Sequence, residues 1–475
     1  MFGGEPNAFS YFALFLFLPV AIVTFFTARP VVATTWLLLG AILFLPERVQ
    51  VDPPVLPPID KQSIATCWVL IGCLLRAPGK LRAAKPLRGI DLLFVGACAG
   101  LFVTNMLNTD EQVFGPLHIQ GTTTYDSFAG TVKDTLAIFL PFFLGRAMFR
   151  SSADLRVFFQ VLAAAALFYS LLALFEIRMS PRCHYDVYGF MQTDYEMTVR
   201  GGGYRPMVFM SGGLALAMFV LSAAIGVLAM RKARMRIALP GLPTLSATPA
   251  GLYLSGILVI VKSTGAILYG LVALPLVGIW RKPGTKLAVV LSVLVLTFPL
   301  LRATQIFPTD AIVEAAESLS EERALSIWFR FFNEDQLLER ASERRWFGWS
   351  GYGRYRVYDP STGEDLSVTD GAWIIDLGAR GVVGFLCLYG MLVIPVFVAA
   401  RKLKTIPEAA DRWLVAALAL IVALNATDLL PNGLFSYLPY FFAGVLMGVL
   451  EGDHWSTAKR DQIAQQHADR RRARA

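Results

Sequence analysis

Two polar segments of the chain carry arginine in patterns that suit the binding of an oxyanion. In the first, residues 198–213, three glycines separate Arg200 from Arg205, so the backbone can approach a ligand closely and point its amides at it. We predict an anion site here, at the entrance of a helix that begins at Pro206 and whose dipole favours negative charge. The alternative is a flexible loop whose arginines reach the membrane surface.

The second segment, residues 302–370, contains thirteen Asp or Glu residues, eight Arg residues and no Lys. Arginine presents a planar fork of donors that matches phosphate or carboxylate, whereas lysine is a point charge. The composition therefore indicates oxyanion binding, and for each single Arg the alternative is a salt bridge within the chain. Connections this long are uncommon in compact structures unless they have a function. We therefore expect the functional site to involve this segment.

Aromatic residues and glycines alternate near the end of this segment, in the sequence Gly348-Trp-Ser-Gly-Tyr-Gly-Arg354. Aromatic faces can stack on sugar rings, so Trp349, Tyr352 and Arg354 are candidates for binding a glycan or a lipid phosphate; a tight loop that stacks on itself has the same pattern. Asp428 is a further candidate, because polar groups at the outer end of a span usually face a cavity. No His, Cys and carboxylate cluster has the spacing of metal ligands, so we expect no metal and no cofactor.

The elements that position these residues are apolar spans. With 55% hydrophobic and 16% charged residues, the composition is typical of an all-α polytopic membrane protein. A helical span needs about 20 apolar residues, and we predict twelve or thirteen transmembrane helices. The candidate stretches are residues 8–28, 31–47, 62–76, 90–107, 131–148, 155–176, 206–230, 247–262, 264–281, 286–303, 371–400, 411–429 and 433–450.

Basic residues predict the orientation, because cytoplasmic loops are enriched in Lys and Arg. The basic loops near residues 76–88, 231–236, 281–286 and 401–404 and the tail 451–475 fall on one side of the predicted topology. We therefore predict a cytoplasmic C-terminus. The segments 48–61, 107–130, 177–205, 302–370 and 430–432 then lie on the extracytoplasmic side. The net charge of +8 follows mostly from this bias, and we expect no nucleic-acid partner.

The predicted organisation has four parts: N-terminal spans over residues 1–303 with outer loops 107–130 and 177–205, a large outer loop 304–370, C-terminal spans over 371–450, and a basic tail 451–475. Within the large loop, Asp310–Arg330 and Glu334–Arg345 have helical spacing of apolar residues. These short amphipathic helices can lie on the membrane surface with aromatic residues such as Trp328 and Phe332 in the headgroup region.

In this order and topology, the Arg200–Pro206 segment, the Gly348–Gly353 segment and a downstream motif resemble the superfamily of O-antigen ligases and O-antigen (Wzy-type) polymerases, and within it a polysaccharide-biosynthesis branch. The family motif is His, then Asn, Ser or Gln, then nine residues and Gly-x-x-Gly. Gly381 and Gly384 lie at the matching offsets from position 370. Position 370 is Asp and position 371 is Gly, so the chain departs from the family at both residues that open the motif.

The resemblance implies a metal-independent membrane glycosyltransferase that uses an undecaprenyl-diphosphate-linked donor. It would transfer or polymerise the glycan onto a glycan or lipid acceptor at the periplasmic face of the bacterial inner membrane. By position, Arg200 or Arg205 matches the first family arginine. Arg330, with Arg323 as second choice, matches the arginine of the long loop. Asp370 takes the place of the family His, which would accept the acceptor proton. Because an Asp near arginines is a weaker base than His, Asp370 would orient the acceptor hydroxyl instead, or the chemistry of the site would differ.

Two alternatives stay open at this point. Asp370 is also well suited to cap the helix that follows it, since Asp is a favoured N-cap residue. The competing function is a non-catalytic transporter or flippase of a polysaccharide or lipid. Transporters tend to show internal repeats and broken helices at the membrane midplane, whereas this sequence shows no repeat and its polar residues gather in the outer loops.

Overall fold

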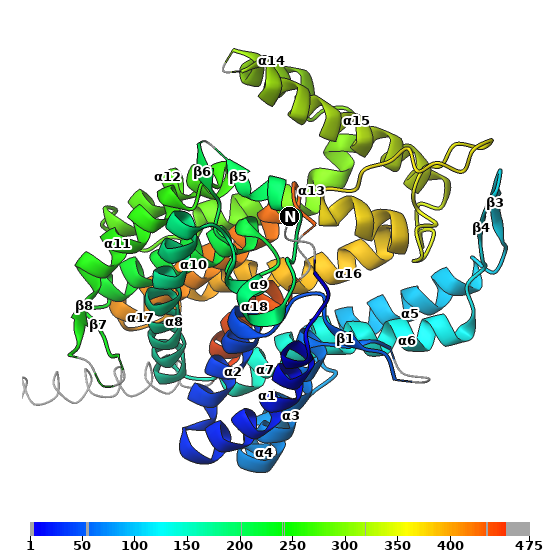
Figure 1. Cartoon of the computed structure of the whole chain (residues 1–475). Helices are drawn as coiled ribbons and strands as arrows, with labels where there is room; N and C mark the ends of the chain where they lie inside the picture. The colour runs from blue at the N-terminus through cyan, green and yellow to red at the C-terminus, as the bar shows by residue number, and fades with distance from the viewer. Residues whose placement is uncertain are drawn as a thin grey trace, which may run out of the picture.

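The computed structural model describes residues 4–53, 57–200, 202–239, 241, 243–318, 320–433 and 436–452. Over these residues the fold is all-α (Figure 1), and the strands form four two-stranded antiparallel hairpins. The helices are α1 (Ala8–Thr27), α2 (Pro30–Phe44), α3 (Lys61–Arg76), α4 (Pro78–Ala83), α5 (Leu92–Met106), α6 (Thr124–Asp134), α7 (Leu140–Met148), α8 (Ser152–Met179), α9 (Cys183–Tyr188), α10 (Gly213–Lys232), α11 (Ala247–Ile260), α12 (Thr264–Gly278), α13 (Lys286–Ala303), α14 (Thr309–Glu317), α15 (Glu321–Glu343), α16 (Ala372–Lys402), α17 (Ala409–Asp428) and α18 (Leu438–Glu451). The strands are β1 (Gln50–Val51) with β2 (Ile59–Asp60), β3 (Gln112–Phe114) with β4 (Leu117–Ile119), β5 (Val199–Arg200) with β6 (Gly203–Tyr204), and β7 (Arg236–Ile237) with β8 (Leu245–Ser246).

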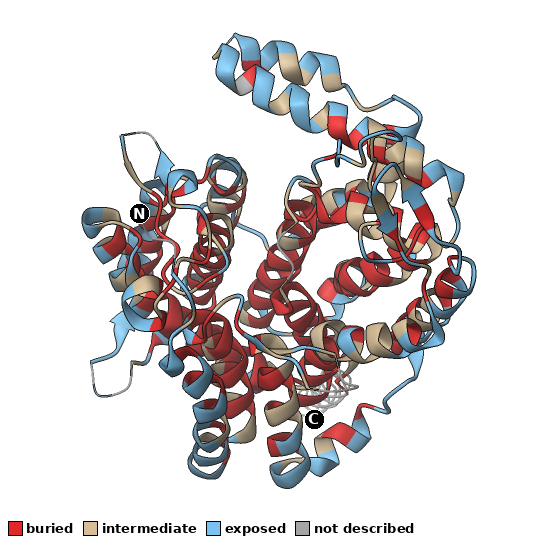
Figure 2. Cartoon of the chain, turned by 45° about the vertical axis from the view of Figure 1, so that its right-hand side comes forward, coloured by how far each residue is buried: buried red, intermediate tan, exposed pale blue. Residues whose placement is uncertain are grey.

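In the described part of the chain, eight helices or joined helices are long and apolar enough to cross a membrane. Four shorter apolar helices, α2, α11, α12 and α18, accompany them. Each apolar stretch predicted from the sequence falls on one of these elements or on α3, which confirms an all-α polytopic membrane protein. Helices α7, α10, α17 and α18 are buried over most of their length and, with α16, contribute much of the core. Buried residues are red in Figure 2.

One predicted boundary is wrong: α10 begins at Gly213 and not at Pro206. The segment before it stays irregular because buried side chains bond its backbone. Glu176 accepts hydrogen bonds from the N–H groups of Met207 at 2.8 Å and Val208 at 2.7 Å. Gln192 donates to the carbonyl oxygen of Val208 at 3.0 Å. Non-helical backbone at membrane depth is tolerated only where it is buried and bonded in this way.

Polar contacts between loops sort into two groups at opposite ends of the spans. At one end, predicted cytoplasmic loops contact the ends of neighbouring spans: Lys402 donates to the carbonyl of Leu450 at 2.7 Å, and Lys232 to that of Trp280 at 2.8 Å. At the other end, two predicted outer loops meet: Arg344 donates to Oδ1 of Asn108 at 2.7 Å. Loops that the basic residues placed on one side therefore contact one another in the structure.

Helices α14 and α15 form a hairpin that projects from the helical body in both views (Figures 1 and 2). The sequence predicted a break near residues 331–333, but the helix of the long loop is continuous through them and breaks between Glu317 and Glu321. Ser320, in extended conformation, precedes α15, and Glu321 and Glu322 occupy the first turn, where negative charge favours a helix start.

Helix α16 is interrupted at Gly381, whose φ of 64° and ψ of −171° are not helical. The backbone groups that the interruption leaves free bond to the loop at 345–350. Trp349 donates its N–H to the carbonyl of Gly378 at 2.8 Å, and Val382 donates to the carbonyl of Arg345 at 2.9 Å. A Cβ at position 381 would lie 2.4 Å from the Trp346 backbone, so the close approach requires glycine. The interruption thus fixes the end of the long loop on α16.

Candidate functional site

The structure brings Arg330 of α15 and Asp370 together. The Nε of Arg330 lies 3.1 Å from Oδ2 of Asp370, and the side chains are 43% and 37% exposed. Both charged groups therefore remain accessible to a ligand. Asp370 does not cap α16, because the N-cap residue is Gly371 and no side chain caps this helix. The pairing with Arg330 replaces the capping alternative.

Position 371 requires glycine. A Cβ on Gly371 would lie 2.1 Å from the carbonyl oxygen of Leu430, so no larger residue fits without movement of the backbone. The start of α16 is packed tightly against the chain that follows α17: Ala372 donates its N–H to the carbonyl of Asn432 at 3.2 Å. The Asp370 backbone is held by this contact.

Arg205 is buried, with 8% of its surface exposed, and its side chain lies against Gly213 at the start of α10. Its Nε has no hydrogen-bond acceptor among the described residues. Burial and the neighbouring Arg200 lower the pKa of Arg205 to about 10, and the charge of Asp428 opposes this shift. The guanidinium therefore stays charged at neutral pH, and its buried donor can serve an anion.

Asn432 connects Arg205's neighbour Asp428 to the start of α16. Its amide donates to Oδ1 of Asp428 at 2.9 Å, while its carbonyl accepts from Ala372. Asp428 itself is buried at the end of α17. The charge of Asp428 acts on Arg205, Arg330 pairs with Asp370, and Asn432 bonds both Asp428 and Ala372, two residues after Asp370. We refer to Arg205, Asp428, Arg330 and Asp370 together as the Arg–Asp cluster. These four residues come from the 198–213 segment, α15, the start of α16 and the end of α17, and each was a candidate from the sequence.

The other predicted arginines lie differently. Arg200 is exposed on β5, and its carbonyl accepts a hydrogen bond from Lys262 at 2.9 Å, which holds the β5–β6 hairpin to the turn between α11 and α12. Arg323 is on α15, and its side chain lies outside the described residues. The basic tail from residue 453 onward also lies outside them.

The aromatic and glycine-rich segment is built into the structure by its own contacts. Trp349 is buried, with the guanidinium carbons of Arg340 and Arg344 at 3.5 and 4.1 Å from its ring centre. Arg354 is fully buried and donates to the carbonyl of Gln120 at 2.9 Å, which ties the long loop to the outer hairpin β3–β4. Tyr352 is 71% exposed. It is therefore the one of these three side chains that a ligand can reach directly.

Sequence reasoning missed a second charged group, formed by Asp134, Arg380 and Asp376. Arg380 bonds both oxygens of Asp134, at 2.5 and 2.9 Å, and its Nε lies 3.5 Å from Asp376. The group faces two cavities of 450 and 510 Å³. Lys133 and Asp134 inside an apolar stretch were the available signal, since charged residues within spans usually face a cavity. The i,i+4 spacing of Asp376 and Arg380 suggested only a local pair.

Helix irregularities lie on both sides of this group. A π-helical turn at Thr135–Phe139 directly follows Asp134, and the Gly381 interruption directly follows Arg380. Single π-helical turns are uncommon, and those that occur often lie at functional sites. The two irregular turns allow residues of α6 and α16 to meet across the cavities.

No three or more His, Cys, Asp or Glu side chains among the described residues gather in a group that could hold a metal ion. The polar side chains of the Arg–Asp cluster are suited to hold an anion and to accept a hydrogen bond from a hydroxyl. The chain matches no model of a known protein family, and no curated protein matches it.

Proposed function

We propose that the protein is a membrane glycosyltransferase that moves a glycan from a polyprenyl-diphosphate donor to an acceptor hydroxyl, as an O-antigen ligase or polymerase does. The observation that carries the proposal is the Arg–Asp cluster. It combines a buried arginine with an unbonded donor, an accessible Arg330–Asp370 pair, and Asn432, which bonds Asp428 on one side and Ala372, two residues after Asp370, on the other. A diphosphate leaving group requires neutralisation of its charge, and arginines supply it without a metal.

In the proposed reaction the acceptor oxygen attacks the anomeric carbon of the donor. The new glycosidic C–O bond forms while the C–O bond to the diphosphate breaks, and polyprenyl diphosphate leaves with the electron pair. The acceptor proton passes to Asp370 or, through it, to water. Arg205 and Arg330 stabilise the negative charge that develops on the leaving diphosphate. Asp370 accepts the hydrogen bond of the acceptor hydroxyl, which aligns it, and then takes its proton as the bond to the anomeric carbon forms.

The competing function is a transporter, and the interruption of α16 is a feature that transporters also show. In this chain, however, the backbone groups freed at Gly381 bond to the loop at 345–350. The interruption therefore anchors the long loop, and nothing about it requires a moving gate. The proposed face is the periplasmic face of the inner membrane, because the Arg–Asp cluster lies among the predicted outer segments.

The test is transfer of a radiolabelled polyprenyl-diphosphate glycan by the purified protein in vesicles. Replacing Arg200, Arg205 or Arg330 singly with Lys should lower the transfer rate, because lysine keeps the charge and loses the fork of donors. For Arg205 and Arg330 we expect a loss of about 10- to 100-fold, the value of a hydrogen bond to a charged group. Arg182→Lys is the matched control, since Arg182 is an exposed outer-loop arginine paired with Asp186 at 2.6 Å.

Full turnover in Arg330→Lys together with both first-segment variants would contradict the proposed diphosphate site. Loss of wild-type transfer on addition of EDTA would contradict the metal-free mechanism. If the protein moves the labelled lipid across the vesicle membrane and forms no new glycosidic bond, the transporter alternative replaces the proposal.

A further inference from the structure

None of the four residues of the Arg–Asp cluster lines the two cavities beside α16, although Ala372 and Leu429, close to Asp370 and Asp428 in the sequence, line the 450 Å³ cavity. Lys133, Asp134, Tyr352 and Arg380 line both cavities, so the two lie side by side, and we treat them together as one polar space. Their volumes, 450 and 510 Å³, fall in the range of about 300 to 1,000 Å³ that is typical of small-molecule sites. The space is large enough for a ligand that the proposed transfer does not assign.

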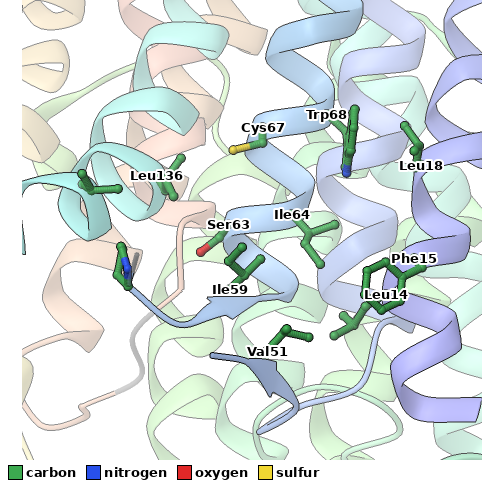
Figure 3. A pocket seen from close by; sticks show the side chains of 12 residues that line it. Leu14, Phe15, Leu18, Val51, Ile59, Ser63, Ile64, Cys67, Trp68 and Leu136 are labelled. Carbon is green, nitrogen blue, oxygen red and sulfur yellow. The ribbon is translucent and has the colours of Figure 1, made fainter. Parts of the chain in front are cut away.

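An apolar pocket of 370 Å³ lies next to this space, between α1, α3 and the segment that carries Val132 and Leu136 (Figure 3). Ile64, Cys67 and Trp68 of α3 form its wall. Because these residues follow the start of α3 at Lys61, the pocket lies about 5 to 10 Å below the helix end at 1.5 Å per residue. Phe15 on its rim is 62% exposed, so the pocket opens on the face of the bundle that meets lipid.

The apolar pocket and the two cavities adjoin one another. Ser63 lines both the apolar pocket and the 450 Å³ cavity, and Pro57 lines both the pocket and the 510 Å³ cavity. Val132 lines the pocket, while the next residue, Lys133, lines the cavities. In Figure 3, Ser63 lies on the side of α3 that faces Leu136. A molecule with an apolar chain and a polar head can therefore occupy both parts at once.

The charges that line the cavities disfavour an anionic head, most of all in the 450 Å³ cavity, where three carboxylates face two cations. The side chains of Asp60, Asp126, Asp134 and Asp376 line them, against the two cations Lys133 and Arg380. A further negative charge would be repelled at this short range, which discriminates against phosphate. Ionised carboxylates are hydrogen-bond acceptors only, so they suit the hydroxyl donors of a sugar or polyol. Tyr352, exposed at the rim, adds an aromatic face and donates its hydroxyl to Asp126 at 2.7 Å.

We propose that this space binds a lipid with an uncharged, hydroxyl-rich head, the head lying between Asp134, Asp376 and Tyr352 and the chain in the apolar pocket. The binding needs no turnover and does not rest on the proposed transfer. It also differs in chemistry from the Arg–Asp cluster, because one site selects for an anion and the other selects against it.

The test is photolabelling of the full-length protein in phosphatidylcholine nanodiscs with an alkyl maltoside that carries a diazirine in its chain. Peptide mapping should place the adducts on the wall of the pocket, at residues such as Cys67, Trp68 and Leu136. Unlabelled dodecyl maltoside at about ten times its Kd should reduce these adducts about tenfold. Dodecyl phosphate, with the same chain and an anionic head, should compete far less.

Asp376→Asn tests the head site and leaves Arg380 with its main partner, because both bonds from Arg380 to Asp134 are kept. We expect this variant to weaken competition by dodecyl maltoside about five- to tenfold, the value of a hydrogen bond. Asp186→Asn, at an exposed outer-loop aspartate, should leave the competition unchanged. Adducts spread over the lipid-facing surface of many spans, or equal competition by both amphiphiles, would overturn the inference.

The two proposals fail independently. Asp370→Asn should label like the wild-type protein even if it no longer transfers the glycan. Labelling that is specific in a protein without any transferase activity would refute the proposed function alone. Active transfer with no specific labelling would refute this lipid site alone.

Discussion

Replacing Asp370 with Asn separates a catalytic role from a structural one. The side chains of Asp370 and Arg330 are each about 40% exposed, and their charged groups lie 3.1 Å apart. Surface pairs of this kind contribute about 0.2 to 1 kcal/mol to stability. No cap is lost, because Gly371 is the N-cap residue and no side chain caps α16. The amide oxygen of Asn can still accept from Arg330. We therefore expect the free energy of unfolding to fall by less than about 1 kcal/mol.

The expected effect on transfer is much larger. A positioned general base contributes about 100- to 10,000-fold, and the amide of Asn cannot accept the proton. This corresponds to about 2.7 to 5.5 kcal/mol of activation free energy, several times the expected loss of stability. The measurement is the initial rate of glycan transfer by wild type and Asp370→Asn, together with thermal unfolding of both. The two effects do not overlap, so a single variant decides between the roles.

Asp186→Asn is the matched control, because its side chain is 38% exposed and pairs with an arginine, as that of Asp370 does. It should retain full transfer. Asp370→His is a second variant: it introduces the residue that the resembled family carries at this position. If the proposed function holds, it should keep part of the activity, with a pH profile closer to neutral. Full transfer by Asp370→Asn would remove this residue from the mechanism.

Two further predictions concern the fold. His184 is buried, accepts a hydrogen bond from the N–H of Glu47 at 3.1 Å and bonds the carbonyl of Phe190 at 2.8 Å. Burial lowers its pKa to about 4. The free energy of unfolding should therefore fall by about 3 kcal/mol as the pH decreases from about 6.5 to about 4. The melting temperature should fall less steeply with decreasing pH in His184→Gln than in the wild type. In His118→Gln, at an exposed histidine, it should fall as in the wild type. The same pH dependence in both variants would contradict the prediction. Gly381→Ala should destabilise the protein by at least about 2 kcal/mol, since it strains a positive φ and meets the Trp346 backbone; Gly256→Ala, with open space around it, should melt like the wild type, and hydrogen exchange should show increased exchange at residues 345–350 only in the first variant.

The sequence predicted the class and most of the elements because span formation is a local property. A run of apolar residues long enough for the bilayer forms a helix wherever it sits in the chain, and every apolar stretch proved to be helical. Arginine without lysine in residues 302–370 pointed to oxyanion binding by this loop, while the family resemblance selected Arg330 among its eight arginines. The prediction of which loops share one side of the membrane also needed no tertiary information, since it uses the basic residues of each loop separately.

The tertiary structure alone decided which groups the charged side chains and the backbone amides contact. Asp376 and Arg380 form the i,i+4 pair that their spacing suggests, yet Arg380 makes its shorter bonds to Asp134, which lies 246 residues away. Trp349 stands in a sugar-binding pattern, yet packing places it beside Arg340 and Arg344. The start of α10 moved to Gly213 because Glu176 and Gln192, distant side chains, bond the backbone of the segment before it. Helix propensity and hydropathy depend on neighbours along the chain, whereas the partner of a charge or of a backbone amide depends on which segments the packed helices bring together.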